Sequence, residues 1–195
     1  MTRSDARQNR ELIMTAFREA TRIKASPLPT MSEIVKLSGL GRGTVYRHFP
    51  DIGALAFSFI ASGYETLFTL SREELRSAAD PAAARQALQS HLHRYRAFSK
   101  ENLALLMRPE CLTSEGYGLA YTDHRKCVRR ALRTMAGIGV ATPPLLETLV
   151  DMVARISEPE HLSAQSLTYE TPDSAAGPAI DLALSLADTS LASLG

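Results

Sequence analysis

The chain has 195 residues, of which 45% are apolar, and a formal net charge of +1. This length suits one globular unit or two small subdomains with a real hydrophobic core. The two cysteines, Cys111 and Cys127, exclude a disulfide framework and favour a reducing, cytoplasmic setting. The N-terminus lacks the apolar run of a signal peptide. No uncharged stretch approaches the roughly 18 apolar residues of a membrane span, so we expect no membrane segment.

The small net charge hides an asymmetry along the chain. Residues 1–50 carry nine Lys or Arg and four Asp or Glu, which gives +5, whereas the remainder gives −4. A basic N-terminal module on an acidic body is expected where only the first part contacts a polyanion.

The first predicted element is an amphipathic helix over residues 8–24. Its apolar side chains recur at helical spacing and are Leu12, Ile13, Ala16, Phe17, Ala20 and Ile23. Three arginines, Arg3, Arg7 and Arg10, lie at its beginning. They belong either to a solvated tail or to an arm that adds non-specific phosphate contacts. No stretch alternates convincingly with period two, so the fold class is predicted to be all-α.

Residues 31–50, MSEIVKLSGLGRGTVYRHFP, predict a helix, a glycine turn and a second helix. Thr30 and Glu33 have the spacing of a capping box, so the first helix should start directly after Thr30. Gly39 stands where the chain must turn sharply, which a residue without a Cβ does at least cost. The second helix is predicted over residues 42–48.

Both predicted helices have an apolar and a polar side. Ile34 and Leu37 form the apolar face of the first, and Val45 and Phe49 form that of the second. This pattern is typical of a helix-turn-helix, whose second helix enters the DNA major groove. The predicted DNA-contacting residues are Thr30, Lys36, Arg42, Gly43, Thr44, Tyr46, Arg47 and His48. The alternative, a helical hairpin without DNA function, is disfavoured because cap, turn and both faces agree.

The segment GLGRGTVYRHF resembles the signature of the tetracycline-repressor (TetR) family of bacterial transcription regulators. The resemblance is specific over about residues 8–60 and concerns architecture beyond them. It departs at Val35 and Gly41, where the family usually has alanine and serine. At Ile52 the family usually has a lysine that reaches a phosphate. The resemblance implies a palindromic DNA operator, a homodimer, a small-molecule effector, and a long fourth helix that transmits effector binding to the DNA module.

The body is predicted to contribute six further helices, about nine in all. They cover residues 51–77, 81–100, 102–108, 115–136, 143–157 and 178–194, with loops at 109–115 and 158–178, the second of which has room for a short helix. Leu119 is among the residues expected to face inward. We therefore predict two domains: a helix-turn-helix DNA-binding domain over residues 1–50, and a ligand-binding and dimerisation domain over residues 51–195.

The last two predicted helices have wide apolar surfaces. Two copies of them would bury each other in a four-helix bundle, so we predict a homodimer through these helices. Burial within one chain is the alternative. A two-fold dimer would also read two half-sites about one helical turn, roughly 34 Å, apart.

The body is also expected to hold a ligand pocket. The candidate lining residues are Phe68, Tyr95, Phe98, Leu103, Met107, Tyr117, Tyr121 and Met152. These side chains are mostly apolar or aromatic, which favours an apolar effector such as an acyl chain, a lactone or an aromatic drug-like molecule. The alternative for each residue is that it fills the core. Whether the effector releases DNA or promotes binding stays open.

A basic face lies on the helix predicted over residues 115–136. Its members are Arg125, Lys126, Arg129, Arg130 and Arg133. A solvated face is favoured over a second nucleic-acid patch.

Two alternative functions compete with that of a DNA-binding regulator. A metal- or thiol-responsive regulator on the same scaffold would use Cys111, Cys127 and His124; the last two lie three residues apart on one helix face. His91 and His93 lie on different faces, which is poor metal geometry. A helical enzyme would need a convergent polar cluster, and the sequence indicates none. We therefore expect a repressor without catalytic residues, cofactor or metal.

Overall fold

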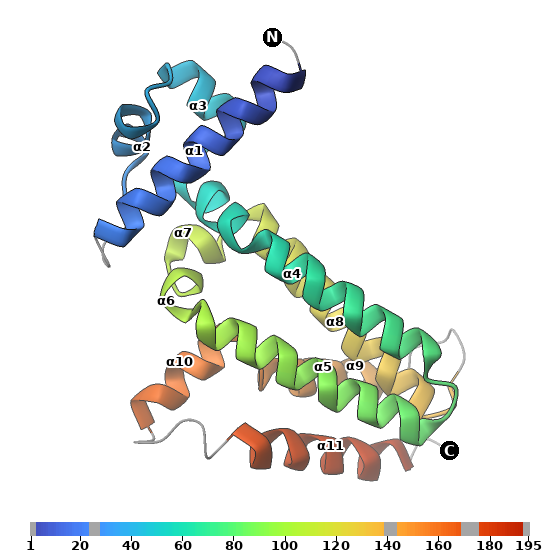
Figure 1. Ribbon diagram of the computed structural model, residues 1–195. Helices are drawn as coiled ribbons and strands as arrows, with labels where there is room; N and C mark the ends of the chain where they lie inside the picture. The colour runs from blue at the N-terminus through green and yellow to red at the C-terminus, as the bar shows by residue number, and fades with distance from the viewer. Residues whose placement is uncertain (1–2, 24–27, 139–143, 169–175, 193–195) are drawn as a thin grey trace. The chain divides into compact units, whose positions relative to one another are not determined.

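The computed structural model describes residues 3–23, 28–138, 144–168 and 176–192 (Figure 1). These residues form eleven α-helices and no β-strand, which confirms the all-α prediction. Two helices are present beyond the nine predicted: α7 (Pro109–Leu112), where a loop was predicted, and α10 (Pro159–Thr168), in the loop that had room for a short helix. Each begins with a proline. Proline suits the first helical position because its missing N–H needs no partner there. The predicted helix ends at residues 24, 143 and 194 lie outside the described residues.

Tertiary contacts divide the chain into two compact units. Unit 1 comprises Met1–Ala61 and Arg108–Gly118, and unit 2 comprises Ser62–Met107 and Leu119–Gly195. The helices α4 (Ile52–Ser77) and α8 (Glu115–Met135) begin in unit 1 and continue in unit 2. The predicted functional boundary after residue 50 stays a prediction.

Unit 1 is built around α1 (Arg3–Ile23), which packs on α2 (Met31–Ser38) and α3 (Arg42–His48). The predicted shared core is confirmed, since the side chains that fill it are buried: Ile13, Ala16, Phe17, Ile34, Val45 and Phe49. Leu12 and Leu37, predicted on apolar faces, are instead 43% and 50% exposed. Each therefore lies outside the buried stripe of its helix.

Unit 1 also holds α7 close against the first turn of α4. A Cβ added at Gly53 would lie 1.9 Å from the backbone oxygen of Glu110, and one added at Gly116 would lie 2.2 Å from the Phe57 ring. Real Cβ atoms do not approach other atoms so closely. Gly53 therefore lets the backbone of α7 lie directly against α4, and Gly116 lets the start of α8 lie against the Phe57 side chain of α4.

Unit 2 contains the remaining helices. These are α5 (Pro81–Glu101), α6 (Leu103–Leu106), α9 (Pro144–Arg155), α10 and α11 (Ala176–Ala192), with the later parts of α4 and α8. The helix α11 packs on α5 and α9.

The register of α8 differs from the prediction at Leu119, which is 62% exposed. The inward side chains of α8 recur three and four residues apart and are Ala120, His124, Cys127, Val128, Ala131 and Leu132. Leu119 falls outside this stripe because each helical residue is rotated by about 100° from the previous one.

By length and mean hydropathy alone, α4 could cross a membrane. The core helix of a soluble protein meets the same criteria. Leu55, Ile60, Leu67 and Phe68 of α4 are buried among protein side chains. A single helix of this composition is therefore weak evidence for a membrane span.

Replacing Gly53 with alanine should destabilise the protein. The added methyl group meets the Glu110 backbone, which cannot move as a flexible side chain would, so we expect the free energy of unfolding to fall by about 1–3 kcal/mol. Gly118→Ala is the matched control, because space is open around Gly118 in α8. It should raise the free energy of unfolding by up to about 1 kcal/mol. Urea unfolding measures both, and equal effects would contradict the close approach.

Candidate functional site

The helix α2 begins with the predicted capping box. The N–H of Glu33 donates to Thr30 Oγ1 over 3.2 Å, and the N–H of Thr30 donates to Glu33 Oε2 over 2.7 Å. At the other end Gly39 has a φ of 68°, the left-handed conformation that favours glycine. Local sequence thus sets both ends of α2 and the direction in which the chain enters α3.

The helix α3 depends on tertiary packing for its position. Its N-cap residue, Gly41, supplies no side-chain hydrogen bond, and the helix has only seven residues. A helix this short is marginal by itself. Val45 and Phe49 anchor it, being 0% and 2% exposed in the core of unit 1.

The outward side of α3 carries polar and cationic side chains that contact one another. The Arg42 guanidinium lies 5.2 Å from the centre of the Tyr46 ring. Arg47 Nε donates to the Gly43 carbonyl over 3.1 Å, and its Nη2 donates to Thr44 Oγ1 over 3.4 Å. These contacts limit the orientations of both arginines, which remain exposed with Lys36.

His48 differs from its neighbours. Its Nε2 atom is buried, and no hydrogen-bond partner for that atom lies among the described residues. In this conformation Nε2 is not accessible to DNA. That other atoms of the His48 ring contact DNA stays a prediction.

Arg10 was expected in either a solvated tail or a phosphate-contacting arm, but it is a residue of α1. Its guanidinium lies 4.7 Å from the centre of the Phe49 ring, and its Nη2 donates to Ser58 Oγ over 3.2 Å. Arg10 therefore links α1 to the end of α3 and to α4 within unit 1. Helical periodicity could not indicate this role, because both partners are distant in sequence.

The eight predicted ligand-lining residues separate into groups. Phe68, Tyr95 and Phe98 surround Tyr64 in unit 2, with ring centres 5.8, 5.8 and 4.6 Å from that of Tyr64. Leu103, Met107 and Tyr121 are half-buried in unit 2, and Met152 is exposed there. Tyr117 is buried in unit 1.

Solved structures with a similar fold identify the architecture. A TetR transcriptional regulator from Rhodococcus sp. RHA1 matches with a TM-score of 0.54 and 21% identity, covering 95% of this chain and 97% of that one. The R. erythropolis transcriptional repressor QsdR, from the TetR family, matches with a TM-score of 0.53 and 19% identity, covering 98% and 96%. A transcriptional regulator from Streptomyces coelicolor A3(2) matches with a TM-score of 0.50 and 18% identity, covering 91% and 98%. This chain has the TetR fold. No family model and no curated protein matches its sequence.

Inside the body of this TetR fold lies a buried histidine pair that the sequence did not reveal. His91 Nε2 and His124 Nδ1 are 2.9 Å apart, and the Tyr95 ring stacks on His124 at 3.8 Å between centres. His91 Nδ1 lies 2.8 Å from Ser71 Oγ, and His124 Nε2 lies 3.1 Å from the Ala154 carbonyl oxygen. The only available signal was that both histidines fall on the inward stripes of their helices.

The direction of each hydrogen bond follows from the carbonyl at one end. Because the oxygen of Ala154 only accepts, His124 Nε2 must carry the proton, which makes His124 Nδ1 an acceptor when the ring is neutral. His91 Nε2 then donates to it, and His91 Nδ1 accepts from the Ser71 hydroxyl. Arg94 Nη2 lies 3.4 Å from Ser71 Oγ and completes the chain as a donor. Four helices, α4, α5, α8 and α9, are joined by this chain.

Burial keeps both rings neutral. Desolvation, followed by the neighbouring His124, lowers the pKa of His91 well below its ordinary value. Desolvation lowers the pKa of His124 to about 4, although the bond to the Ala154 carbonyl opposes the shift. The order of donors and acceptors from Arg94 to the Ala154 carbonyl requires both histidines to be neutral.

The residues proposed for a metal or thiol sensor do not gather into a ligand set. Among the described residues no group of three or more His, Cys, Asp or Glu could hold a metal ion. Cys111 lies in unit 1 and Cys127 in unit 2. Both are buried, and desolvation raises the pKa of each thiol to about 11, so neither is a reactive thiolate at neutral pH.

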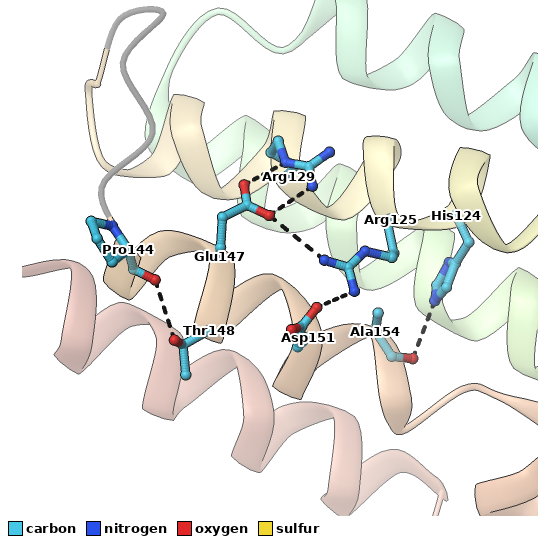
Figure 2. A network of polar contacts seen from close by, with 8 residues as sticks. All are labelled: His124, Arg125, Arg129, Pro144, Glu147, Thr148, Asp151 and Ala154. Atoms are coloured by element: carbon cyan, nitrogen blue, oxygen red, sulfur yellow. Dashed lines mark hydrogen bonds and ion pairs between the residues drawn. The ribbon is translucent and has the colours of Figure 1, made fainter.

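Part of the basic face of α8 is paired rather than solvated (Figure 2). Arg129 binds both carboxylate oxygens of Glu147, over 2.6 and 2.7 Å. Arg125 pairs with Asp151 and lies 3.6 Å from Glu147. Both carboxylates belong to α9, so these pairs join α8 to α9 beside the His124–Ala154 bond.

The histidine pair predicts a loss of stability in acid. Both pKa values are lower in the folded protein than the ordinary value of 6.5, so the unfolded chain binds protons that the folded protein excludes. The contribution is fully present above pH 6.5 and decreases as the pH falls towards about 4. Each histidine should add up to about 1.4 kcal/mol per pH unit to this decrease. Urea unfolding at pH 7 and pH 5 measures it.

Two histidine variants distinguish the contribution of the buried pair to this loss of stability from that of other titrating groups. His124→Gln should make the decrease shallower, whereas His93→Gln, at an exposed position of α5, should leave it as in the wild type. Equal pH dependence in all three proteins would contradict the origin in the buried pair.

Proposed function

We propose that this protein is a dimeric, ligand-responsive transcriptional regulator, acting as a repressor, that binds a palindromic DNA operator through α2 and α3. The proposal rests on one observation, the geometry of the helix-turn-helix. Its α2 is capped, its turn at Gly39 is left-handed, and its anchored α3 exposes arginines. The TetR fold supports it, because the three similar structures are described as transcriptional regulators.

The DNA-contacting residues have distinct proposed roles. Arg42 and Arg47 reach guanine edges or phosphates from the outward side of α3, and Lys36 adds charge from α2. Thr30, Thr44, Tyr46 and His48 position the module on the DNA backbone, where Gly43 permits close approach. The assignment as a repressor follows the similar R. erythropolis protein, which is a transcriptional repressor.

The last long helices are proposed to form the dimer interface. Leu145 and Met152 of α9 and Leu182 and Leu186 of α11 are exposed, although a monomeric protein usually buries such side chains. A second copy would cover them in a four-helix bundle and hold two α3 helices for two half-sites. Residues 51–195 would then form the ligand-binding and dimerisation domain of a cytoplasmic protein.

The effector is proposed to bind in unit 2 and to be largely apolar. The aromatic cluster of Tyr64, Phe68, Tyr95 and Phe98 supports this class, because rings at these spacings offer stacking surfaces to an apolar ligand. Since α4 continues from unit 2 into unit 1, a ligand that prefers one conformation of α4 would change DNA affinity.

Removing single groups from α3 should weaken DNA binding without unfolding the protein. A palindromic duplex selected from a random pool serves as operator in a gel-shift assay. Arg42→Ala should weaken binding by about 10- to 100-fold, because a charged contact is lost, and Tyr46→Phe by about fivefold, because one hydroxyl is lost. Arg22→Ala removes the same charge from an exposed site of α1 and should have little effect. Unchanged affinity in both α3 variants, or a flat salt dependence, would contradict this interface.

Charged residues on α11 should dissociate the dimer. Leu182→Glu with Leu186→Glu places two carboxylates on the proposed interface while leaving the buried core unchanged, so a folded monomer is expected in sedimentation velocity. Leu70→Glu, at an exposed position of α4, is the control and should remain dimeric. A double variant as dimeric as the wild type would place the interface elsewhere.

A further inference from the structure

Unit 2 contains a cavity of ≈ 690 Å³ between the end of α4 and the second half of α8. Small-molecule sites typically have volumes of about 300–1,000 Å³. Its wall includes Arg72, Leu75 and Ala79 from the α4 side and Lys126, Arg130 and Ile138 from the α8 side. None of the residues predicted to line a ligand pocket contributes to it. This cavity is therefore a site separate from the aromatic cluster.

The wall of the cavity has an excess of positive charge. Five cationic side chains and one carboxylate, Asp123, line it. Asp123 serves two of the cations, lying 2.9 Å from Lys126 and 3.6 Å from Arg72. Arg129 is neutralised by Glu147 (Figure 2), but no carboxylate pairs with Arg130 among the residues that the structure describes.

The Arg130 side chain is anchored to the backbone of α4. Its Nε donates to the Leu75 carbonyl oxygen over 3.1 Å. That carbonyl is one of the last four of α4, which have no partner inside the helix. The bond uses one of the five N–H donors of the guanidinium and so restricts its orientation while leaving four donors.

The dipole of α8 does not explain these cations. Basic side chains are stabilised by a helix dipole only within the last turn. Lys126 and Arg130 lie nine and five residues before the last residue of α8, Met135, and Arg72 lies on a different helix.

The floor of the cavity is apolar. Leu75 and Cys127 are 2% and 4% exposed, and Ile138 is half-buried beside them. Cations around an apolar floor match a molecule that has a negative group and an apolar body, because each part then meets its complement. A flat phosphate-binding surface would need no such floor.

We propose that this cavity binds a small organic monoanion with an apolar body, whose carboxylate or sulfonate lies between Arg130 and Arg72. Leu75 and Ile138 contact the apolar body. The proposal does not depend on DNA binding, because every residue it uses belongs to unit 2.

The test compares three probes on the wild-type protein by isothermal titration calorimetry at low ionic strength. The probes are 1-naphthoate, 1-naphthalenemethanol and 1-naphthylmethylammonium, which share the ring system and differ in charge. The expected result is one naphthoate per chain, with the neutral alcohol at least about tenfold weaker and the cation weakest. Equal binding of all three, or no binding of naphthoate, would overturn the proposal.

Matched double variants locate the site. Arg72→Met with Arg130→Met should weaken naphthoate binding by about tenfold or more. Arg76→Met with Arg155→Met removes the same charge at exposed positions outside the cavity and should leave binding unchanged. Equal losses in both doubles would overturn the proposal, since they would show a response to net charge alone.

A cavity-filling variant covers the case in which the arginine double does not fold. Ala79 is exposed beside the cavity, so Ala79→Trp adds bulk there without changing any charge. Thermal unfolding confirms that each variant is folded. A folded Ala79→Trp protein should lose naphthoate binding, and wild-type affinity in it would overturn the proposal. A short DNA duplex that displaces naphthoate equally from the wild type and from the control double, both of which keep the cavity, would likewise overturn the proposal in favour of a nucleic-acid site.

Discussion

The burial of Val45 and Phe49 beneath α3 is the constraint on which the proposed DNA module depends. A helix of seven residues without a side-chain N-cap has little stability by itself. The two side chains fix both its position and its rotation, because burying one stripe turns the opposite stripe towards solvent. Arg10 reinforces this arrangement from α1 through its contact with the Phe49 ring. The exposed arginines of α3 are thus presented by a core to which they do not contribute.

The body is organised by a different kind of interaction. The hydrogen-bonded chain from Arg94 through Ser71, His91 and His124 to the Ala154 carbonyl has a single direction and joins four helices. Apolar packing tolerates small sliding of helices, whereas a directed polar chain in a dry interior requires each partner to be in place. This chain therefore specifies the relative positions of the helices in unit 2 more narrowly than their apolar stripes do.

The basic face of α8 combines two roles that look identical in the sequence. Arg125 and Arg129 pair with carboxylates of α9 and join two helices (Figure 2). Lys126 and Arg130, one residue further along in each case, line the cavity beside α4 together with Arg129. Arg129 has both roles, since it lines the cavity while its guanidinium pairs with Glu147. The proposed anion site therefore depends on Arg130 and Arg72 rather than on Arg129.

The sequence by itself determined the features that arise within a few residues of one another. The capping box of Thr30 and Glu33, the left-handed turn at Gly39 and the spacing of apolar side chains on each helix are local, and the structure contains them. Only the tertiary structure decided which helix covers each apolar face. The His91–His124 pair and the cavity between α4 and α8 join residues far apart in the chain. Helical periodicity states which side of a helix is buried, but the partner against which it is buried depends on how the whole chain packs.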